Sequence, residues 1–109
     1  MILFLDDLSY ESRHRIADYL AAAGDYMAEH HKCNRVAGTP DGRVCALGAI
    51  CKVTPVASAI RSDVITALLV FLGVPAIPDW NDKSTESEVI QALYDAAVKF
   101  RPDEMVVSA

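Results

Sequence analysis

Residues 85–100 read TESEVIQALYDAAVKF, and this stretch decides the fold class. Its apolar side chains recur at three- and four-residue spacing, the period of an α-helix with one buried face. Thr85 and Glu88 have the spacing of a capping box, in which each side chain accepts the other residue's backbone amide. Pro102 prevents the helix from continuing far beyond the stretch. The stretch predicts a helix over residues 85–100, with a stripe wide enough to pack between two neighbours.

A second long helix is predicted over residues 9–32 by the same period. Its apolar stripe consists of Ile16, Tyr19, Leu20, Ala23, Met27 and His30. Gly24 lies inside this pattern, where it costs about 1 kcal/mol relative to alanine. We therefore expect a close helix contact or a local irregularity at Gly24.

The middle of the chain predicts shorter elements. Thr39-Pro40-Asp41-Gly42 is a turn signature, and the run of small residues after it predicts a short buried helix over residues 44–52. Thr54-Pro55 can begin a further helical segment. Ser62 and Asp63 are interpreted as the start of a helix over residues 62–72 that is apolar on almost every side. Residues 75–83 are expected to form a loop.

These elements predict a mainly α protein, a single small helical domain spanning residues 1–109. We expect four helices, over residues 9–32, 44–52, 62–72 and 85–100, and a short strand pair made by residues 2–5 and 105–107. The 52% hydrophobic content is typical of a folded domain. The expected core residues are Ile16, Leu20, Cys45, Leu47, Ile65, Leu68, Leu69, Trp80, Val89, Leu93 and Phe100.

Charge and composition exclude some classes of partner. The net charge is −5 and the basic residues are scattered, so we expect no nucleic-acid partner. The apolar run over residues 64–77 is too short to cross a bilayer, which needs about 20 residues, so we expect no membrane partner. Three cysteines and no signal peptide in the opening MILFL indicate a reducing cytoplasm.

The order of motifs resembles a family of small uncharacterised actinobacterial and actinobacteriophage proteins, classed as a domain of unknown function. The resemblance spans residues 12–100. It rests on Asp41-Gly42, Cys45-Ala46-Leu47-Gly48-Ala49, Asp79-Trp80-Asn81-Asp82, Thr85, Glu88-Val89-Ile90-Gln91-Ala92-Leu93 and Ala96-Ala97. The family usually has a Trp and a Gly-rich stretch where this chain has His30-His31-Lys32-Cys33, so a role for that Trp does not transfer. The resemblance implies a phage or actinobacterial cytoplasm and no catalytic residue.

Cys45 is the candidate nucleophile, because a thiol near a helix start and downstream of Arg43 can be activated, with His30 or His31 as base. The alternative is a core cysteine. The thiols and histidines also raise the question of zinc, but no CxxC pair is present and the spacing argues against it. We therefore expect no metal and no cofactor.

Trp80, Asn81 and Asp82 are the other candidate binding residues, because an aromatic ring beside an amide and a carboxylate can bind a ligand. The alternative is that Trp80 plugs the core while Asn81 and Asp82 bond local backbone amides. No common enzyme signature is present, so we assign no catalytic residue and favour a non-enzyme.

The leading hypothesis is a small phage-type accessory protein that acts by protein–protein interaction. Its partner is a host protein or a second copy of the chain. The contact surface is residues 64–72 or the Trp80 loop, because a helix that is apolar all round has few neighbours in a small domain. The rival hypothesis is a thiol-dependent enzyme or small-ligand binder that uses Cys45.

Overall fold

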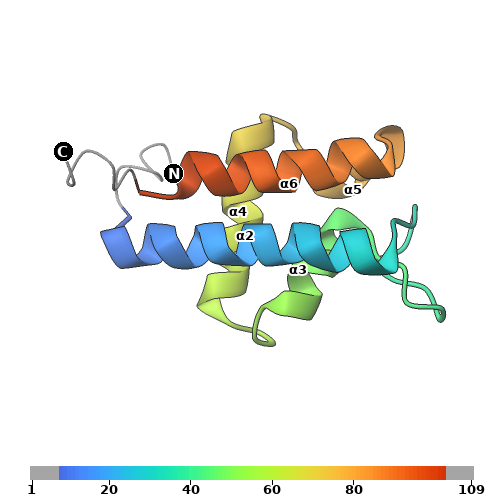
Figure 1. The fold of residues 1–109 in the computed structure, drawn as a ribbon, viewed down its shortest axis with the longest axis horizontal. Coiled ribbons are helices and arrows are strands. Elements are labelled where there is room, and N and C mark those ends of the chain that lie inside the picture. The colour runs from blue at the N-terminus through green and yellow to red at the C-terminus, as the bar shows by residue number, and fades with distance from the viewer. Residues whose placement is uncertain (1–7, 103–109) are drawn as a thin grey trace.

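The computed structural model describes residues 8–102, which contain five α-helices (Figure 1). They are α2 (Tyr10–His30), α3 (Ala46–Val53), α4 (Ala59–Leu72), α5 (Ile77–Lys83) and α6 (Glu86–Phe100). Within the described residues, β pairing is limited to isolated bridges that involve Val44. The mainly helical prediction is confirmed, while the predicted number of helices is one too few. The strand pair expected from the termini lies outside the described residues.

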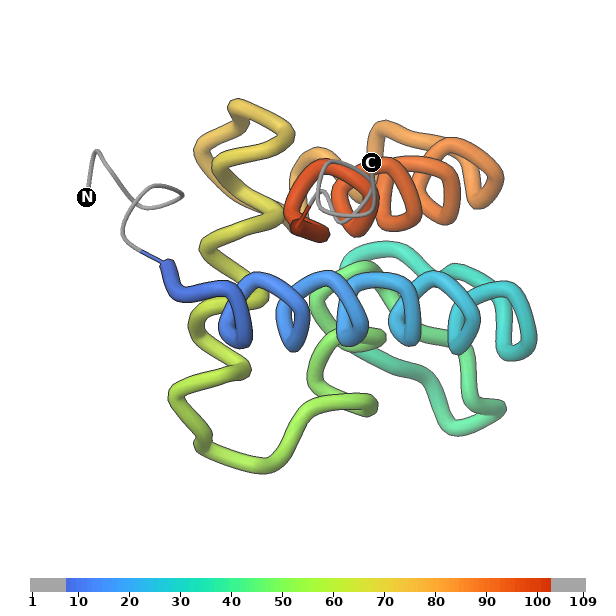
Figure 2. Tube along the Cα trace, turned by 60° about the vertical axis from the view of Figure 1, so that its left-hand side comes forward, coloured from blue at the N-terminus to red at the C-terminus, as the bar shows by residue number. Residues whose placement is uncertain are grey.

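Helices α2 and α6 run antiparallel and side by side, and α4 crosses both of them (Figures 1 and 2). The contact is close at Gly24, where a Cβ atom would lie 2.8 Å from the Tyr94 ring. The Tyr94 hydroxyl also donates a 2.6 Å hydrogen bond to Asp25, which holds the ring against the glycine. The close helix contact expected at Gly24 is confirmed, and it explains a glycine in mid-helix.

The ends of the long helices follow from their capping residues. The Ser9 side chain accepts the Ser12 amide and begins α2, which ends at His30 and is followed by the capping residue His31, with φ at 75°. At α6, the Thr85 hydroxyl accepts the Glu88 amide and Glu88 accepts the Thr85 amide, which confirms the capping box. These caps place both helices within two residues of their predicted limits.

Helix α4 begins three residues earlier than predicted. Its cap is Ser58, whose side chain accepts the Arg61 amide at 3.2 Å, so the assignment of the start to Ser62 and Asp63 is wrong. The Arg61 guanidinium bonds the carbonyls of Cys51 and Thr54, which ties this first turn to the end of α3. Thr54 ends α3 and begins no helical segment, because its hydroxyl donates back to the carbonyl of residue 50 at 2.7 Å.

Helix α5 occupies most of the expected loop over residues 75–83. Pro78 lies in the first turn, where its missing N–H is not needed by the helix. Only Ile77 and Asn81 are buried along α5, so its seven residues give no apolar period. The helix brings Trp80, Asn81 and Asp82 onto one rigid element, whereas a loop was expected to carry them.

The core is formed mainly by α2, α4 and α6. Of the expected core residues, seven are buried, namely Ile16, Leu20, Cys45, Leu68, Val89, Leu93 and Phe100. Four are partly buried and pack against the cluster, namely Leu47, Ile65, Leu69 and Trp80. On α4, Val64 and Leu68 face the core while Val70 is 53% exposed. The apolar helix is therefore covered on one side by the described residues.

Residues 8–102 contain no single helix with the length and apolar character needed to cross a membrane. Helices α4 and α5 meet that test only when taken together, and they are bent by 56° at their junction.

Candidate functional site

The candidate residues gather around the connector, residues 31–45, which joins α2 to α3. The connector folds back on itself through backbone hydrogen bonds. Two join its ends, Val44 N–H to His31 O at 3.0 Å and Cys33 N–H to Val44 O at 3.0 Å, and two join its second half to itself, Cys45 N–H to Ala37 O at 3.1 Å and Thr39 N–H to Arg43 O at 3.0 Å. Val44 thus pairs in parallel with Lys32 and in antiparallel with Gly38. Val44 was expected in a helix, but these bonds hold it extended and α3 begins at residue 46.

Asn81 joins both ends of the connector region. Its side chain is fully buried, its Oδ1 accepts the Ala46 N–H at 3.0 Å, and its Nδ2 donates to the Cys33 carbonyl at 3.0 Å. A continued parallel ladder would bond Ala46 N–H directly to that carbonyl. The Asn81 carboxamide therefore replaces one hydrogen bond of the ladder. The sequence predicts that Asn81 bonds local backbone amides, whereas its side chain bonds backbone groups of the connector and of α3.

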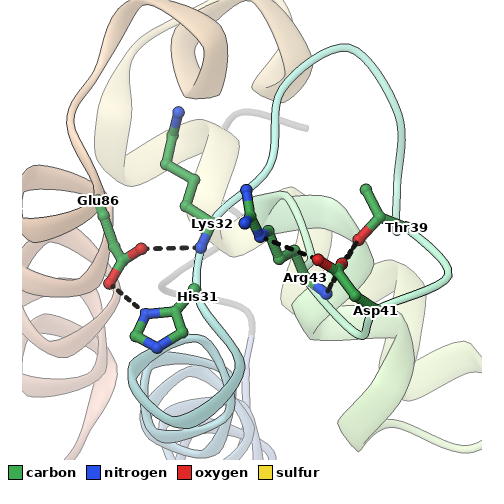
Figure 3. Close-up of polar contacts among 6 residues, drawn as sticks. All are labelled: His31, Lys32, Thr39, Asp41, Arg43 and Glu86. Carbon is green, nitrogen blue, oxygen red and sulfur yellow. Dashed lines mark hydrogen bonds and ion pairs between the residues drawn. The ribbon is translucent and has the colours of Figure 1, made fainter.

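Asp82 and Glu86 bind backbone amides in the first part of the connector, residues 32–35. Asp82 Oδ1 accepts the Arg35 N–H at 3.0 Å, and this bond holds the pKa of Asp82 below its ordinary value. Glu86 accepts the Lys32 N–H at 2.9 Å and contacts His31 Nδ1 at 3.1 Å (Figure 3). These two partners, first the Lys32 amide and then His31, lower the pKa of Glu86. Both carboxylates thus satisfy connector amides that no helix or strand satisfies.

The far end of the connector is a β-turn that contains its own polar contacts (Figure 3). The Gly42 N–H donates to the Thr39 carbonyl at 3.0 Å, which confirms the predicted turn. Asp41 accepts the Thr39 hydroxyl and lies 3.3 Å from Arg43 Nε. The Thr39 hydroxyl bond, ahead of the contacts with Arg43, lowers the pKa of Asp41. Arg43 is therefore paired within the turn.

Cys45 caps α3, with its sulfur accepting the Gly48 N–H at 3.3 Å, and is 5% exposed. It lines a hollow of about 100 Å³, whose walls are Arg35, Val36, Ala37, Cys45, Leu47, Pro78 and Asp82. The histidines proposed as its base make contacts elsewhere: His30 Nδ1 is 3.0 Å from the Tyr26 carbonyl, and His31 contacts Glu86. The described contacts therefore do not assemble a thiol–imidazole pair.

Trp80 does not line the hollow that contains Cys45 and Asp82 but a second one. That hollow has a volume of about 220 Å³ and is lined by Val74, Pro75, Ala76, Asp79, Trp80 and Lys83. The indole is partly buried and packs against the core, as the plug interpretation expected. The four candidate residues therefore divide: Cys45, Asn81 and Asp82 meet at the connector, and Trp80 belongs to a surface formed by α5 and the end of α4.

Sequence reasoning missed Cys33 and Glu86 as parts of the connector region, whereas the small residues around Gly48 predict a close backbone approach. A Cβ atom on Gly48 would lie 1.9 Å from the Ala37 carbonyl oxygen, so only glycine lets the connector pass over α3. Its signal was the run of small residues over 44–52, which indicated close backbone approach. Cys33 and Glu86 have no local sequence signal, because their partners lie on other elements.

Within residues 8–102, no group of three or more His, Cys, Asp or Glu side chains is arranged to hold a metal ion. Residues 11–99 match the model of a family of unknown function (DUF6197). No curated protein matches the chain, and no solved structure matches it either.

Proposed function

The chain belongs to the DUF6197 family of unknown function, and we propose that it acts as a small accessory protein that binds another protein through one apolar surface. We call this the α4–α5 surface; it consists of Val70, Val74, Pro75 and Trp80. The observation that carries the proposal is the hollow at Trp80, which begins directly after the last turn of α4, where Val70 is exposed. Val70 is 53% exposed one turn before the hollow begins.

The chemistry of this surface suits a protein partner. Val74, Pro75 and the Trp80 ring provide apolar contact area, while Asp79 and Lys83 add charged groups to the lining of the hollow. An aromatic anchor surrounded by apolar groups, with polar groups outside, is the usual composition of an interface centre. The partner is a host protein or a second copy of the chain. The resemblance in motifs and the free cysteines support an actinobacterial or phage-infected cytoplasm as the setting.

The rival hypothesis, a thiol-dependent enzyme or small-ligand binder, has less support from the geometry. Ligand pockets usually enclose about 300–1,000 Å³. The hollow beside Cys45 has only about 100 Å³ and the thiol is 5% exposed. A larger hollow of about 350 Å³ lies between the connector and α3, but its lining is Ala37, Gly38, Gly48, Cys51 and Lys52, without a carboxylate or imidazole.

Two matched substitutions test the proposal. Val70→Asp places a charge on the α4–α5 surface, and Val98→Asp places the same charge near the end of α6, where the valine is 75% exposed. The wild type and both variants are used to capture proteins from an actinobacterial lysate and are also examined by sedimentation velocity. We expect the wild type and Val98→Asp to bind a partner protein or to form a dimer, and Val70→Asp to do neither. The emission of Trp80, the only tryptophan, should shift on binding.

Two results would overturn the proposal. One is equal retention of every captured protein by both variants, which would place the contact elsewhere. The other is a wild-type chain that stays monomeric and captures nothing. Circular dichroism on both variants confirms that each is folded before either result is interpreted.

A further inference from the structure

Cys33 and Cys45 lie on the two backbone segments that pair within the connector. The Cys33 N–H bonds the Val44 carbonyl, the Val44 N–H bonds the His31 carbonyl, and Lys32 and Val44 form the bridged pair. In parallel pairing, the next residues along both segments stand opposite each other, and their side chains leave on the same face. Cys33 and Cys45 are those next residues.

The distance between these segments is fixed on both sides of the cysteine pair. On one side is the direct 3.0 Å bond from Cys33 N–H to the Val44 carbonyl, and on the other is the buried Asn81 carboxamide between Cys33 O and Ala46 N–H. Paired strands lie about 4.7–4.9 Å apart. The Asn81 carboxamide widens the separation of the two segments only beyond the cysteines. We therefore expect the Cα atoms of Cys33 and Cys45 to lie within the range of about 4.4–6.8 Å at which disulfides form.

The surroundings of the thiols agree with this placement. Both side chains are buried, with Cys33 8% exposed and Cys45 5% exposed. Burial, followed by the neighbouring Cys45 thiol, raises the pKa of Cys33. The third cysteine, Cys51, is half-buried on α3 and lines the hollow between the connector and that helix.

We propose that Cys33 and Cys45 are a redox-active dithiol, which a low-molecular-weight disulfide oxidises to an intramolecular disulfide. One protein thiolate attacks the oxidant, so that its S–S bond breaks, a mixed disulfide forms between the protein sulfur and one small thiol, and the other small thiol is released. The second protein thiolate then displaces the small thiol of the mixed disulfide and forms the Cys33–Cys45 bond. Two protein thiols are oxidised, one small disulfide is reduced, and the two thiol protons leave on the two released thiols.

This site is distinct from the α4–α5 surface and does not depend on the proposed function. The disulfide would join Cys33, three residues after the end of α2, to the cap of α3, closing residues 33–45 into a covalent loop. Since the Asn81 carboxamide already spans the same two segments, oxidation would lock an arrangement that the reduced chain holds by hydrogen bonds.

The experiment equilibrates the Cys51→Ser variant in buffers of reduced and oxidised glutathione, both folded and in guanidinium chloride. Trypsin then separates the two cysteines, because Lys32, Arg35, Arg43 and Lys52 bound the peptides 33–35 and 44–52. Mass spectrometry measures the fraction of these peptides that is disulfide-linked, which is recognised by a mass two hydrogen atoms below the sum of the two peptides. The Cys33→Ser variant is the control and should give no cross-link.

We expect the equilibrium constant for the cross-link to be roughly tenfold to a hundredfold greater in the folded chain than in guanidinium, because folding already brings the ends of the loop together. An equal or smaller constant in the folded chain would overturn the proposal. So would single glutathione adducts, or cross-links between chains, in place of the internal disulfide.

Discussion

At the scale of single residues, the connector is held by side chains that substitute for backbone partners. Asn81 is fully buried, and its Oδ1 accepts the Ala46 N–H while its Nδ2 donates to the Cys33 carbonyl and, at 3.3 Å, to Asp82 Oδ1. No buried side-chain nitrogen or oxygen in residues 8–102 lacks a partner. Because an unsatisfied buried polar group costs about 1–3 kcal/mol, the identity of Asn81 matters more than its volume.

Asn81→Asp keeps the acceptor for the Ala46 amide but turns a carboxylate oxygen toward the Cys33 carbonyl. We expect a loss of about 2–4 kcal/mol in unfolding free energy at pH 7, measured by urea denaturation. Burial and the facing carbonyl would raise the pKa of the new carboxyl above its ordinary value of about 3.9. The folded state would then bind the proton more tightly, so the loss should shrink as the pH falls toward about 4.

The matched control is Asn34→Asp, which makes the same change in the exposed part of the connector beside Lys32. It should alter stability by less than about 0.5 kcal/mol, as surface substitutions usually do. If both variants lost stability equally at pH 7, the Asn81 carboxamide would not hold the connector.

At the scale of elements, Glu86 links the start of α6 to the residues that follow α2. Helices α2 and α6 run antiparallel, so the end of one lies beside the start of the other (Figures 1 and 3). The 2.9 Å bond from the Lys32 amide and the 3.1 Å contact with His31 are both made by one carboxylate. The side chain is 38% exposed, so solvent screens much of this interaction.

Glu86→Gln keeps an acceptor oxygen and removes the charge. The pKa of Glu86 is lowered from 4.5, so its contribution to stability is present above pH 4.5 and is lost as the pH falls through the lower folded value. After screening, we expect the variant to be less stable by about 0.5–1 kcal/mol at pH 7. Urea denaturation at pH 7 and below pH 4 should show this difference closing in acid.

Glu29→Gln, on the exposed side of α2, provides the comparison and should change little at either pH. A stability difference for Glu86→Gln that persisted unchanged in acid would contradict the charge-based account. The geometry of the amide hydrogen bond would then be the cause.

At the scale of the whole molecule, the sequence predicts the helices that have a continuous apolar period and a capping residue. Helices α2 and α6 were located within two residues because each has a continuous stripe and a polar cap. Helix α5 was missed because it buries only Ile77 and Asn81. The role of Asn81 depends on residues 48 and 35 positions away, which meet only after the helices pack. Local patterns contain no information about such pairings.

The same long-range contacts predict that the described domain unfolds in one cooperative step. Helix α5 cannot leave while the rest stays folded, because its departure would strand the buried Ala46 amide and the Cys33 carbonyl, which Asn81 satisfies. Trp80 on α5 is the only tryptophan, so its fluorescence reports α5 while far-UV circular dichroism reports all the helices. We expect the two signals to give the same urea midpoint. Repeating the titration at two protein concentrations separates unfolding from self-association. A fluorescence transition that precedes the circular dichroism transition at both concentrations would show that α5 unfolds on its own. Asn81 would then not couple α5 to the connector.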